Sequence, residues 1–308
     1  MSYSMSSAPA GTRPIPTLDS ARAGRRPWSD YLALSKPRVT GMVMLTALAV
    51  CYVGERRPLG VWYMLHLMLG TGLLAAGTAA LNQLWERESD GVMRRTSLRP
   101  LPGHRLVPLQ ALLFGLATAV LGLLELALRI NPLTAALGLG TSLVYLLAYT
   151  PLKSRSPLST VVGALPGASP ILMGWAAARQ QIDAPGWALF GIQLLWQFPH
   201  FLAIAWLYKE DYERAGICML PVVDAAGTET GFQMRLYALA LLPVSLLPTL
   251  LGLAGSLYFA GALLLGVAFV ACAWRTAAQL TKASSRRLLQ ASVIYLPALF
   301  ALLALDKR

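Results

Sequence analysis

Nine apolar segments divide this chain of 308 residues. Each has about 20 residues, the length that a helix needs to cross the hydrocarbon core of a bilayer. The segments are expected near residues 39–55, 61–85, 107–128, 131–149, 158–178, 185–208, 232–254, 256–279 and 288–305. A backbone in lipid must satisfy its own hydrogen bonds. The sequence therefore predicts an all-α, polytopic membrane protein, with nine transmembrane helices forming a bundle around a central cavity.

Basic residues fall mainly on one side of the predicted membrane. With the N-terminus inside, the inner segments carry 20 of the 26 Lys and Arg residues. This bias sets the orientation. We therefore expect a bacterial cytoplasmic (inner) membrane protein with its N-terminus and active-site loops on the cytoplasmic side. The one-sided distribution of Lys and Arg, which orients a membrane protein, accounts for the net charge of +12. The expected partner is therefore the lipid bilayer and not nucleic acid.

The first 28 residues differ in composition from the rest of the chain. They are rich in Ser, Ala, Pro and Arg and too polar for a secretory signal. This favours a disordered tail over residues 1–28, with an organellar transit peptide as the alternative, and a membrane domain over residues 29–308. Cys51, Cys218 and Cys272 show no pairing pattern and are interpreted as small core residues.

Asn82, Glu86 and Asp90 lie where the second apolar segment leaves the membrane. Their spacing of four residues predicts a ladder roughly 12 Å long on one helix face, able to hold a cation. Of the 14 acidic residues, eight fall in two inner loops, 86–90 and 210–229. Solvated salt bridges are the simpler explanation. The mixture with Arg and Lys also suits Mg²⁺ and a diphosphate, because Mg²⁺ takes oxygen ligands and basic side chains bind phosphate.

A diphosphate at the membrane surface beside apolar helices suits an amphipathic substrate such as a prenyl diphosphate. Ionising its allylic C–O bond requires neutralisation of the leaving group, which metal ions and arginines supply. The allylic cation then needs a dry pocket with aromatic ring faces. Candidate aromatic residues are Trp85, Tyr145, Tyr149, Trp175, Trp196, Trp206 and Tyr208. Interfacial or packing roles explain most of them.

At these residues the chain resembles the intramembrane aromatic prenyltransferases, and within them the branch that acts on haem. The family's N-x-x-x-D-x-x-x-D motif and the M-x-R-T-x-x-R-P-L segment after it are matched by Asn82, Glu86, Asp90, Met93, Arg95, Thr96, Arg99, Pro100 and Leu101. Four further stretches resemble the haem branch: Lys36 to Thr40, Tyr149 to Lys153, Trp196 to Phe201 and Asp211 to Pro221. The family's second aspartate motif is incomplete here. Asp211 matches it, whereas Glu210 is adjacent and not four residues away.

This resemblance implies a reaction in which farnesyl diphosphate ionises and the vinyl group of protohaem IX attacks the allylic cation. Water then captures the new carbocation, which gives haem O. The implied Mg²⁺ ligands and catalytic residues are Asn82, Glu86, Asp90 and Asp211. The implied diphosphate-binding residues are Arg95, Arg99 and Lys153, with Lys36, Arg38 and Arg155 as secondary candidates. Whether the product passes to a haem A synthase or to terminal oxidase assembly stays open.

Polar residues inside the predicted spans are further candidates. Gln193, Gln197 and His200 form one stripe on the sixth helix. His200 is expected either to meet the haem iron or a propionate or to hydrogen-bond across helices. The predicted haem and prenyl pocket comprises His200, Gln197, Trp196 and Tyr149.

Three further features of the spans are interpreted as structural. His66 is interpreted as a packing residue, and Glu125 as the partner of Arg129 one helical turn later. Gly163, Gly167 and Gly174 form a small-residue face that allows close helix contact, with room for a flat macrocycle as the alternative.

Three other functions compete with this one. A prenyltransferase acting on a phenolic or quinone-precursor acceptor would share the site, but its second aspartate cluster should be fuller. A secondary transporter would place charges near mid-membrane on broken helices, whereas this sequence places them at the inner ends. A purely structural membrane subunit leaves the ladder of Asn82, Glu86 and Asp90 unexplained.

Overall fold

The computed structural model describes residues 28–308. Within this range nine helices are long and apolar enough to cross a membrane. They are α3 (Pro37–Gly54), α4 (Val61–Trp85), α6 (Pro108–Arg129), the run of α7 (Pro132–Leu143), η1 (Val144–Tyr149) and α8 (Thr150–Leu152), α9 (Ser159–Arg179), α10 (Ala184–Leu207), α13 (Thr228–Leu250), α14 (Ser256–Ala278) and α15 (Lys282–Leu305). No strand occurs in the described range beyond one isolated bridge, between Ala254 and Lys307. The predicted all-α membrane bundle is confirmed.

Most helix ends lie within a few residues of the predicted ones, and the larger differences have a cause. The last helix begins at Lys282, six residues before the expected 288, because Thr281 caps it by accepting a hydrogen bond from Ser284 N. Its first turns are polar, so hydropathy does not detect them. The expected tail over residues 1–28 lies outside the described residues except for Trp28, which begins α2 (Trp28–Leu34).

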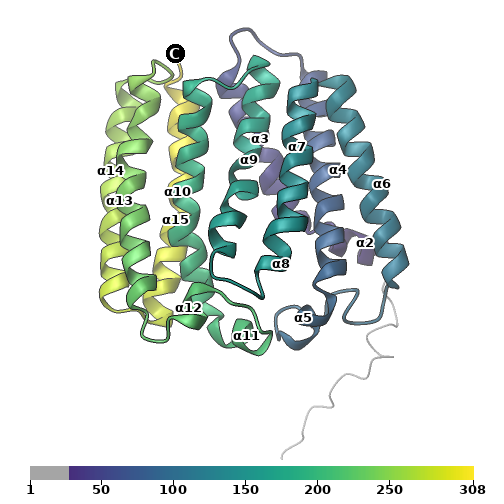
Figure 1. The fold of residues 1–308 in the computed structure, drawn as a ribbon. Helices are drawn as coiled ribbons and strands as arrows, with labels where there is room; N and C mark the ends of the chain where they lie inside the picture. Colours follow the sequence, from purple (N-terminus) through teal and green to yellow (C-terminus); the bar gives the residue numbers. More distant parts are fainter. Residues whose placement is uncertain (1–27) are drawn as a thin grey trace, which may run out of the picture.

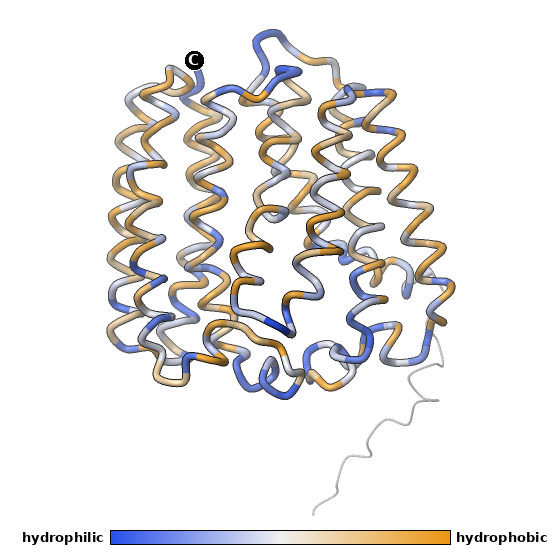
Figure 2. The backbone as a smooth tube through the Cα atoms, in the orientation of Figure 1, coloured by the Kyte–Doolittle hydropathy of each residue, from blue (hydrophilic) through white to orange (hydrophobic). Residues whose placement is uncertain are grey.

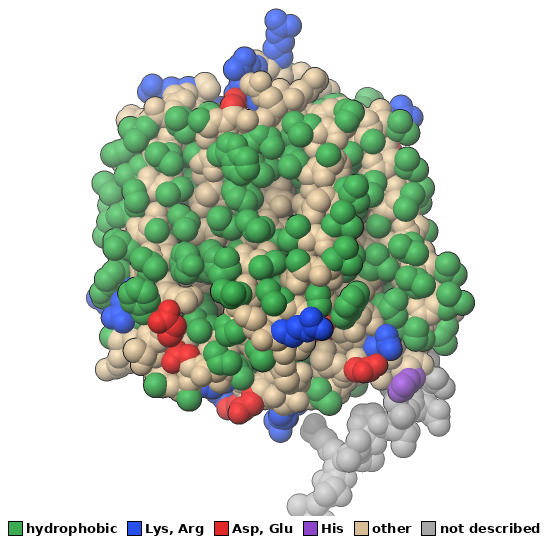
Figure 3. All heavy atoms as spheres, viewed as in Figure 1, with side chains coloured by type: hydrophobic (Ala, Val, Ile, Leu, Met, Phe, Trp, Pro, Cys, Tyr) green, Lys and Arg blue, Asp and Glu red, His purple; other side chains and the backbone are tan. Residues whose placement is uncertain are grey.

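Short helices collect at one end of the bundle. Figure 1 shows α5 (Arg87–Val92), α11 (Lys209–Arg214) and α12 (Leu220–Val223) at its lower end, with the C-terminus at the opposite end. Hydrophilic backbone segments gather at both ends in Figure 2, and apolar residues fill the length between them. On the visible face, Figure 3 shows apolar side chains along the sides and charged ones at the two ends. The molecule therefore has the surface of a multi-pass membrane protein.

Helix α9 lies at the centre of the bundle. Two thirds of its membrane window is buried, and it packs against α3, α7 and α10. The predicted small-residue face is confirmed, since a Cβ at Gly174 would lie 2.2 Å from the carbonyl oxygen of Ala47. A Cβ at Gly163 would lie 2.5 Å from the ring of Tyr149. Small residues on α9 therefore let both α3 and η1 approach closely.

Helices α4 and α6 form a second close pair. A Cβ at Gly122 of α6 would lie 2.4 Å from the backbone nitrogen of Leu74, and one at Gly77 of α4 would lie 2.5 Å from the carbonyl oxygen of Gly115. Gly70 and Gly77 are seven residues apart, as are Gly115 and Gly122. This matching spacing is a sequence signal for the pair.

Two residues within the spans differ from their sequence interpretation. Glu125 contacts Nδ1 of His66 at 2.5 Å, from α6 to α4, and no ion pair joins it to Arg129. His66 is therefore a polar partner and not merely a packing residue. The reason is that the α4 and α6 backbones lie close enough for an interhelical contact to replace the expected pair within α6.

Candidate active site

A cavity of about 460 Å³ lies among α3, α4, the α7 to η1 run, α9, α10 and α11. The basic residues that line it, Lys36, Arg95 and Lys153, belong to the loops at the end where α5 and α11 lie. Its deeper wall includes Leu74, Gly138 and Met173. The cavity is therefore cationic at one end and apolar beyond it.

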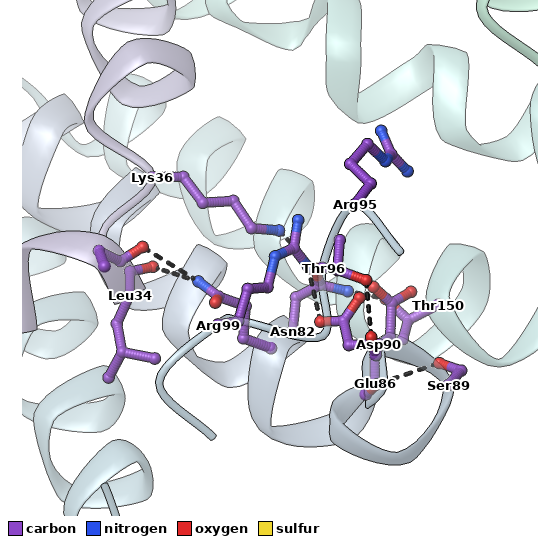
Figure 4. Close-up of polar contacts among 12 residues, drawn as sticks. Leu34, Lys36, Asn82, Glu86, Ser89, Asp90, Arg95, Thr96, Arg99 and Thr150 are labelled. Carbon is purple, nitrogen blue, oxygen red and sulfur yellow. Dashed lines mark hydrogen bonds and ion pairs between the residues drawn. The ribbon is translucent and has the colours of Figure 1, made fainter. Parts of the chain in front are cut away.

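Asn82 lies fully buried beside the basic end of the cavity. Its Oδ1 accepts a hydrogen bond of 2.9 Å from Lys36 Nζ, and its Nδ2 donates one of 3.1 Å to Thr150 Oγ1. The Tyr145 hydroxyl donates a longer one, 3.5 Å, to the same Oδ1. Figure 4 shows Lys36 and Thr150 approaching this amide from different elements.

Lys36 has a left-handed backbone, with φ of 46°, directly before Pro37. Non-glycine residues rarely adopt this conformation, and such strain gathers at functional sites. The conformation ends the preceding segment and sends the ammonium group toward Asn82. Burial lowers the pKa of the Lys36 amine to about 7, and the positive charges of Arg99 and Lys153 add to this effect.

The predicted ladder is present, although its helix is interrupted. Helix α4 ends at Trp85 and α5 begins at Arg87, so Glu86 has an intermediate conformation between them. Backbone hydrogen bonds still run from Glu86 N to Asn82 O and from Asp90 N to Glu86 O, at 2.9 and 2.8 Å. The four-residue register therefore continues through the bend.

Each carboxylate of the ladder is paired with a basic side chain. Lys153 Nζ lies 2.7 Å from Glu86 Oε1, and Arg99 Nη1 lies 2.6 Å from Asp90 Oδ2. Burial disfavours the charge of Glu86, but the ammonium of Lys153 outweighs it and holds the pKa of that carboxyl below its ordinary value. Asp90 is buried, and Thr96 Oγ1 donates to its backbone carbonyl. Each of the three ladder residues therefore has a basic partner: Lys153 and Arg99 form ion pairs with Glu86 and Asp90, and Lys36 donates a hydrogen bond to the neutral amide of Asn82.

The π-helical turn η1 places two tyrosines at the cavity. Pro151 has no N–H, and its ring would clash with the carbonyl of Leu147 in a regular α-helix. The helix widens over residues 144–149 instead, a change that often marks functional sites. Tyr145 and Tyr149 both line the cavity, with ring centroids 5.2 Å apart. Lys153 Nζ lies 4.6 Å from the centroid of the Tyr149 ring.

Arg95 connects the two acidic loops. Its guanidinium lies 5.1 and 5.5 Å from the ring centroids of Tyr208 and Tyr212, and it donates to the Tyr212 hydroxyl at 3.3 Å. Asp211 precedes Tyr212 in α11 and forms an ion pair with Arg214. The loops after α4 and α10 therefore meet at one end of the cavity.

The remaining predicted site residues lie farther out or face elsewhere. Arg38 and Arg155 are exposed and do not line the cavity. His200 contacts Ser292 Oγ of α15 at 2.7 Å and stacks on Trp196, which donates to the Ser292 carbonyl.

Gln197 donates to the carbonyls of Ala164 and Gln193, behind the wall of the cavity. Of the predicted haem and prenyl pocket, Tyr149 alone is among the residues lining this cavity. Tyr145 was one of seven candidate aromatic residues but was not placed in the predicted pocket, and Thr150 was not predicted at all. The four-residue spacing from Tyr145 to Tyr149 is the signal for the first.

Oxygen atoms suited to a hard cation lie beside this end of the cavity, in contact with the lining bases Lys36 and Lys153. The donor set is one amide oxygen and the carboxylates of Glu86 and Asp90. Among residues 28–308, no group of three or more His, Cys, Asp or Glu side chains is arranged to hold a metal ion by itself. This donor set fits Mg²⁺, which proteins usually bind through one or two carboxylates together with substrate phosphates.

The chain belongs to the UbiA prenyltransferase family, whose sequence profile matches residues 43–300. Protoheme IX farnesyltransferase of Solibacter usitatus (strain Ellin6076) is 47% identical to it over 287 residues, which are 90% of this chain and 98% of that protein. The predicted family resemblance is confirmed.

Two solved structures have the same fold. Digeranylgeranylglyceryl phosphate synthase superimposes with a TM-score of 0.75 at 18% identity, covering 91% of this chain and 98% of that one. A UbiA homologue of Archaeoglobus fulgidus, bound to GPP and Mg²⁺, has a TM-score of 0.66 at 17% identity and covers 89% and 99%.

Proposed function

We propose that this protein transfers the farnesyl group of farnesyl diphosphate to the vinyl group of protohaem IX, which gives haem O. The observation that carries the proposal is a cavity with an apolar wall and a basic end lined by Lys36, Arg95 and Lys153. Beside that end, Glu86 and Asp90 form ion pairs with Lys153 and Arg99. This shape and polarity match a prenyl chain that bears a diphosphate. The acceptor is supported by the name of the Solibacter usitatus relative, protoheme IX farnesyltransferase.

The diphosphate binds at the basic end of the cavity. Lys36, Arg95 and Lys153 line it there, and Arg99 lies on Asp90 beside them. Charge-assisted hydrogen bonds from these groups neutralise the leaving diphosphate as the C–O bond breaks. Arg38 and Arg155, both exposed, attract the anion from solution.

Asn82, Glu86 and Asp90 hold Mg²⁺ together with the substrate, and Asp211 lies on the facing loop as the fourth candidate. Bound Mg²⁺ supplies charge neutralisation of the diphosphate. A UbiA homologue of Archaeoglobus fulgidus bound Mg²⁺ together with GPP, which supports this choice of metal. The basic partners of the ladder residues are the same groups that bind phosphate, so they keep these side chains paired until substrate arrives.

Tyr145 and Tyr149 face the position at which the allylic cation forms. Their rings line the cavity directly beyond the basic end, and a ring face stabilises a cation. The apolar wall excludes water that would otherwise capture the farnesyl cation. His200, Gln197 and Trp196 lie on the α10 side, outside this cavity, so a haem contact there requires approach from that side.

The protein acts in the bacterial cytoplasmic membrane, with the charged end of the cavity facing the cytoplasm. The bias of Lys and Arg supports this orientation. Both substrates are amphipathic and reach the cavity at the inner membrane surface.

The test is incubation of the purified protein with protohaem, farnesyl diphosphate and Mg²⁺, followed by mass spectrometry of the extracted pigment. We expect a product heavier than protohaem by one farnesyl group plus one hydroxyl group, because water adds to the carbocation and a proton leaves, and no product when EDTA replaces Mg²⁺. A parallel reaction offers a phenolic acid in place of protohaem. Prenylation of the phenolic acid with unchanged protohaem would overturn the choice of acceptor.

A further inference from the structure

Thr150 lies between the π-helical turn and the acidic ladder. It is buried, with 4% of its surface exposed, and it is the residue that follows η1. Its hydroxyl makes two hydrogen bonds, of 2.8 Å to the carbonyl oxygen of Tyr145 and of 3.1 Å to Nδ2 of Asn82. Thr150 thus joins the carbonyl of Tyr145 to the amide of a ladder residue; Figure 4 shows Thr150 beside Asn82.

The direction of these two hydrogen bonds is fixed by chemistry. A carbonyl oxygen can only accept, so the single hydroxyl proton of Thr150 points to Tyr145. The oxygen of Thr150 then presents a lone pair to Asn82, and only the NH₂ arm of that amide can donate to it. Thr150 therefore determines which arm of Asn82 faces Thr150 itself and which faces Lys36 and the Tyr145 hydroxyl, two residues whose side chains line the cavity.

The other neighbours of Asn82 fit the same orientation. Lys36 Nζ lies 2.9 Å from Oδ1 and donates to it, since an amine nitrogen carries N–H donors whether or not it is protonated. The Tyr145 hydroxyl is also placed to donate to Oδ1, at 3.5 Å. Lys36 and Tyr145, however, line the cavity. Lys36 is proposed to engage the diphosphate, and Tyr145 the allylic cation. Thr150 does not line the cavity, so its hold on the amide is independent of the substrate.

We propose that Thr150 is a positioning residue that orients the amide of Asn82, so that Oδ1 is directed at the cation and the diphosphate while Lys36 turns to the substrate. This inference rests on the proposed function, because Asn82 serves there as a cation ligand. The π turn contributes by bringing the carbonyl of Tyr145 within reach of the Thr150 hydroxyl. Without that acceptor, the hydroxyl could instead donate to the amide oxygen of Asn82, which would favour the opposite orientation of the amide.

The test measures binding of the unreactive analogue farnesyl thiolodiphosphate by calorimetry at a series of Mg²⁺ concentrations. Thr150→Val keeps the side-chain shape and removes the hydroxyl. We expect the Mg²⁺ concentration for half-maximal analogue binding to rise roughly 10-fold, the lower end of the effect of losing a group that orients a metal ligand. Thr150→Ser should restore the wild-type value to within about 3-fold, because it keeps the hydroxyl.

The matched control is Thr118→Val on α6. The Thr118 hydroxyl donates to backbone carbonyls of its own helix and lies outside the site, so Mg²⁺ dependence should not change. A shift as large as that of Thr150→Val would mean a general effect of the substitution and would overturn the inference.

A double-mutant cycle with Asn82→Asp separates orientation from packing. A carboxylate presents oxygen on both arms, so it has no wrong orientation for Thr150 to prevent. When Asn82→Asp is already present, adding Thr150→Val should therefore shift Mg²⁺ dependence by less than about 2-fold, against roughly 10-fold in the wild type. Equal shifts in both backgrounds would show that Thr150 acts only through packing.

Two outcomes distinguish this inference from the proposed function. If the wild-type protein binds no analogue at any Mg²⁺ concentration, the proposed function fails. If it binds and Thr150→Val behaves identically, only the role of Thr150 fails. Should Thr150→Val not fold, Thr150→Cys and Thr150→Ser form a size-matched pair, because sulfur is a weak acceptor. Equal Mg²⁺ dependence for Cys and Ser would then overturn the inference.

Discussion

At the scale of single residues, the site is a set of acid and base pairs. Glu86 with Lys153 and Asp90 with Arg99 are separated by 2.7 and 2.6 Å. Removing one partner of such a half-buried pair leaves the other charge unpaired, which costs more than the pair itself contributes. Substitutions here therefore report on catalysis only when the fold is checked beside activity.

Glu86→Gln and Asp90→Asn should each abolish turnover. Each removes a charge from the proposed cation site, so we expect haem O formation to fall by at least about 10²-fold, with normal membrane insertion and expression. Mass spectrometry of pigment from membranes measures the loss. Glu88→Gln is the matched control, since that carboxylate is exposed and pairs only with Arg87. Normal haem O formation by either site variant would contradict the assignment.

At the scale of elements, an acidic side chain stabilises the start of α13. Asp224 Oδ2 accepts from the backbone nitrogen and hydroxyl of Thr230 at 2.7 and 2.8 Å, and Oδ1 accepts from Gly227 N. Burial would raise the pKa of Asp224, but these hydrogen bonds outweigh it and lower the pKa below its ordinary value. Asp224 therefore serves as a cap for the seventh membrane helix.

Asp224→Ala should destabilise the protein by about 1 kcal/mol at neutral pH, the usual cost of losing such a cap. A lowered carboxyl pKa gives stability that is present above the unfolded value of about 4 and lost as the pH falls through the folded value. The difference in melting temperature from the wild type should therefore shrink below about pH 4. A gap that stays constant down to about pH 2 would show that the carboxylate charge is not involved.

The close contact between α4 and α6 depends on glycine residues, which carry no side chain. Gly122→Ala introduces a Cβ 2.4 Å from Leu74 N, so the helices must separate, at a cost of about 1–3 kcal/mol. Gly140→Ala on α7 is the control, because a Cβ there meets nothing within 4 Å. Thermal unfolding in detergent should show a lower melting temperature for Gly122→Ala and no decrease for Gly140→Ala. Equal melting temperatures would contradict the close contact.

At the scale of the whole molecule, the odd number of spans in residues 28–308 puts the two ends of this range on opposite sides of the membrane. The charged loops around α5 and α11 lie at the end away from the C-terminus (Figure 1). With the cytoplasmic orientation proposed from the basic residues, alkaline phosphatase fused after Arg308 should be active and green fluorescent protein at the same point should be dark. The reverse pattern would invert the topology and place the site outside.

Hydropathy and spacing predicted the parts of the molecule that depend on local sequence. The nine spans follow from segment length, and the register of Asn82, Glu86 and Asp90 follows from helical geometry. His200 shows both the reach and the limit of such reasoning. A hydrogen bond across helices was one of its two expected roles, and His200 makes one to Ser292 of α15. A helix face does not reveal its neighbour, so the partner itself was not predicted.

The amino-acid sequence by itself determined that this protein crosses the membrane as helices and which residues lie at the helix ends, because solvation by lipid acts on each segment separately. Tertiary structure decided which acid meets which base, that Thr150 holds the amide of Asn82, and that Glu125 contacts His66. These last two contacts, and that of Glu86 with Lys153, join residues 59 to 68 positions apart. Such pairs form only when close helix packing brings distant segments within reach of a hydrogen bond.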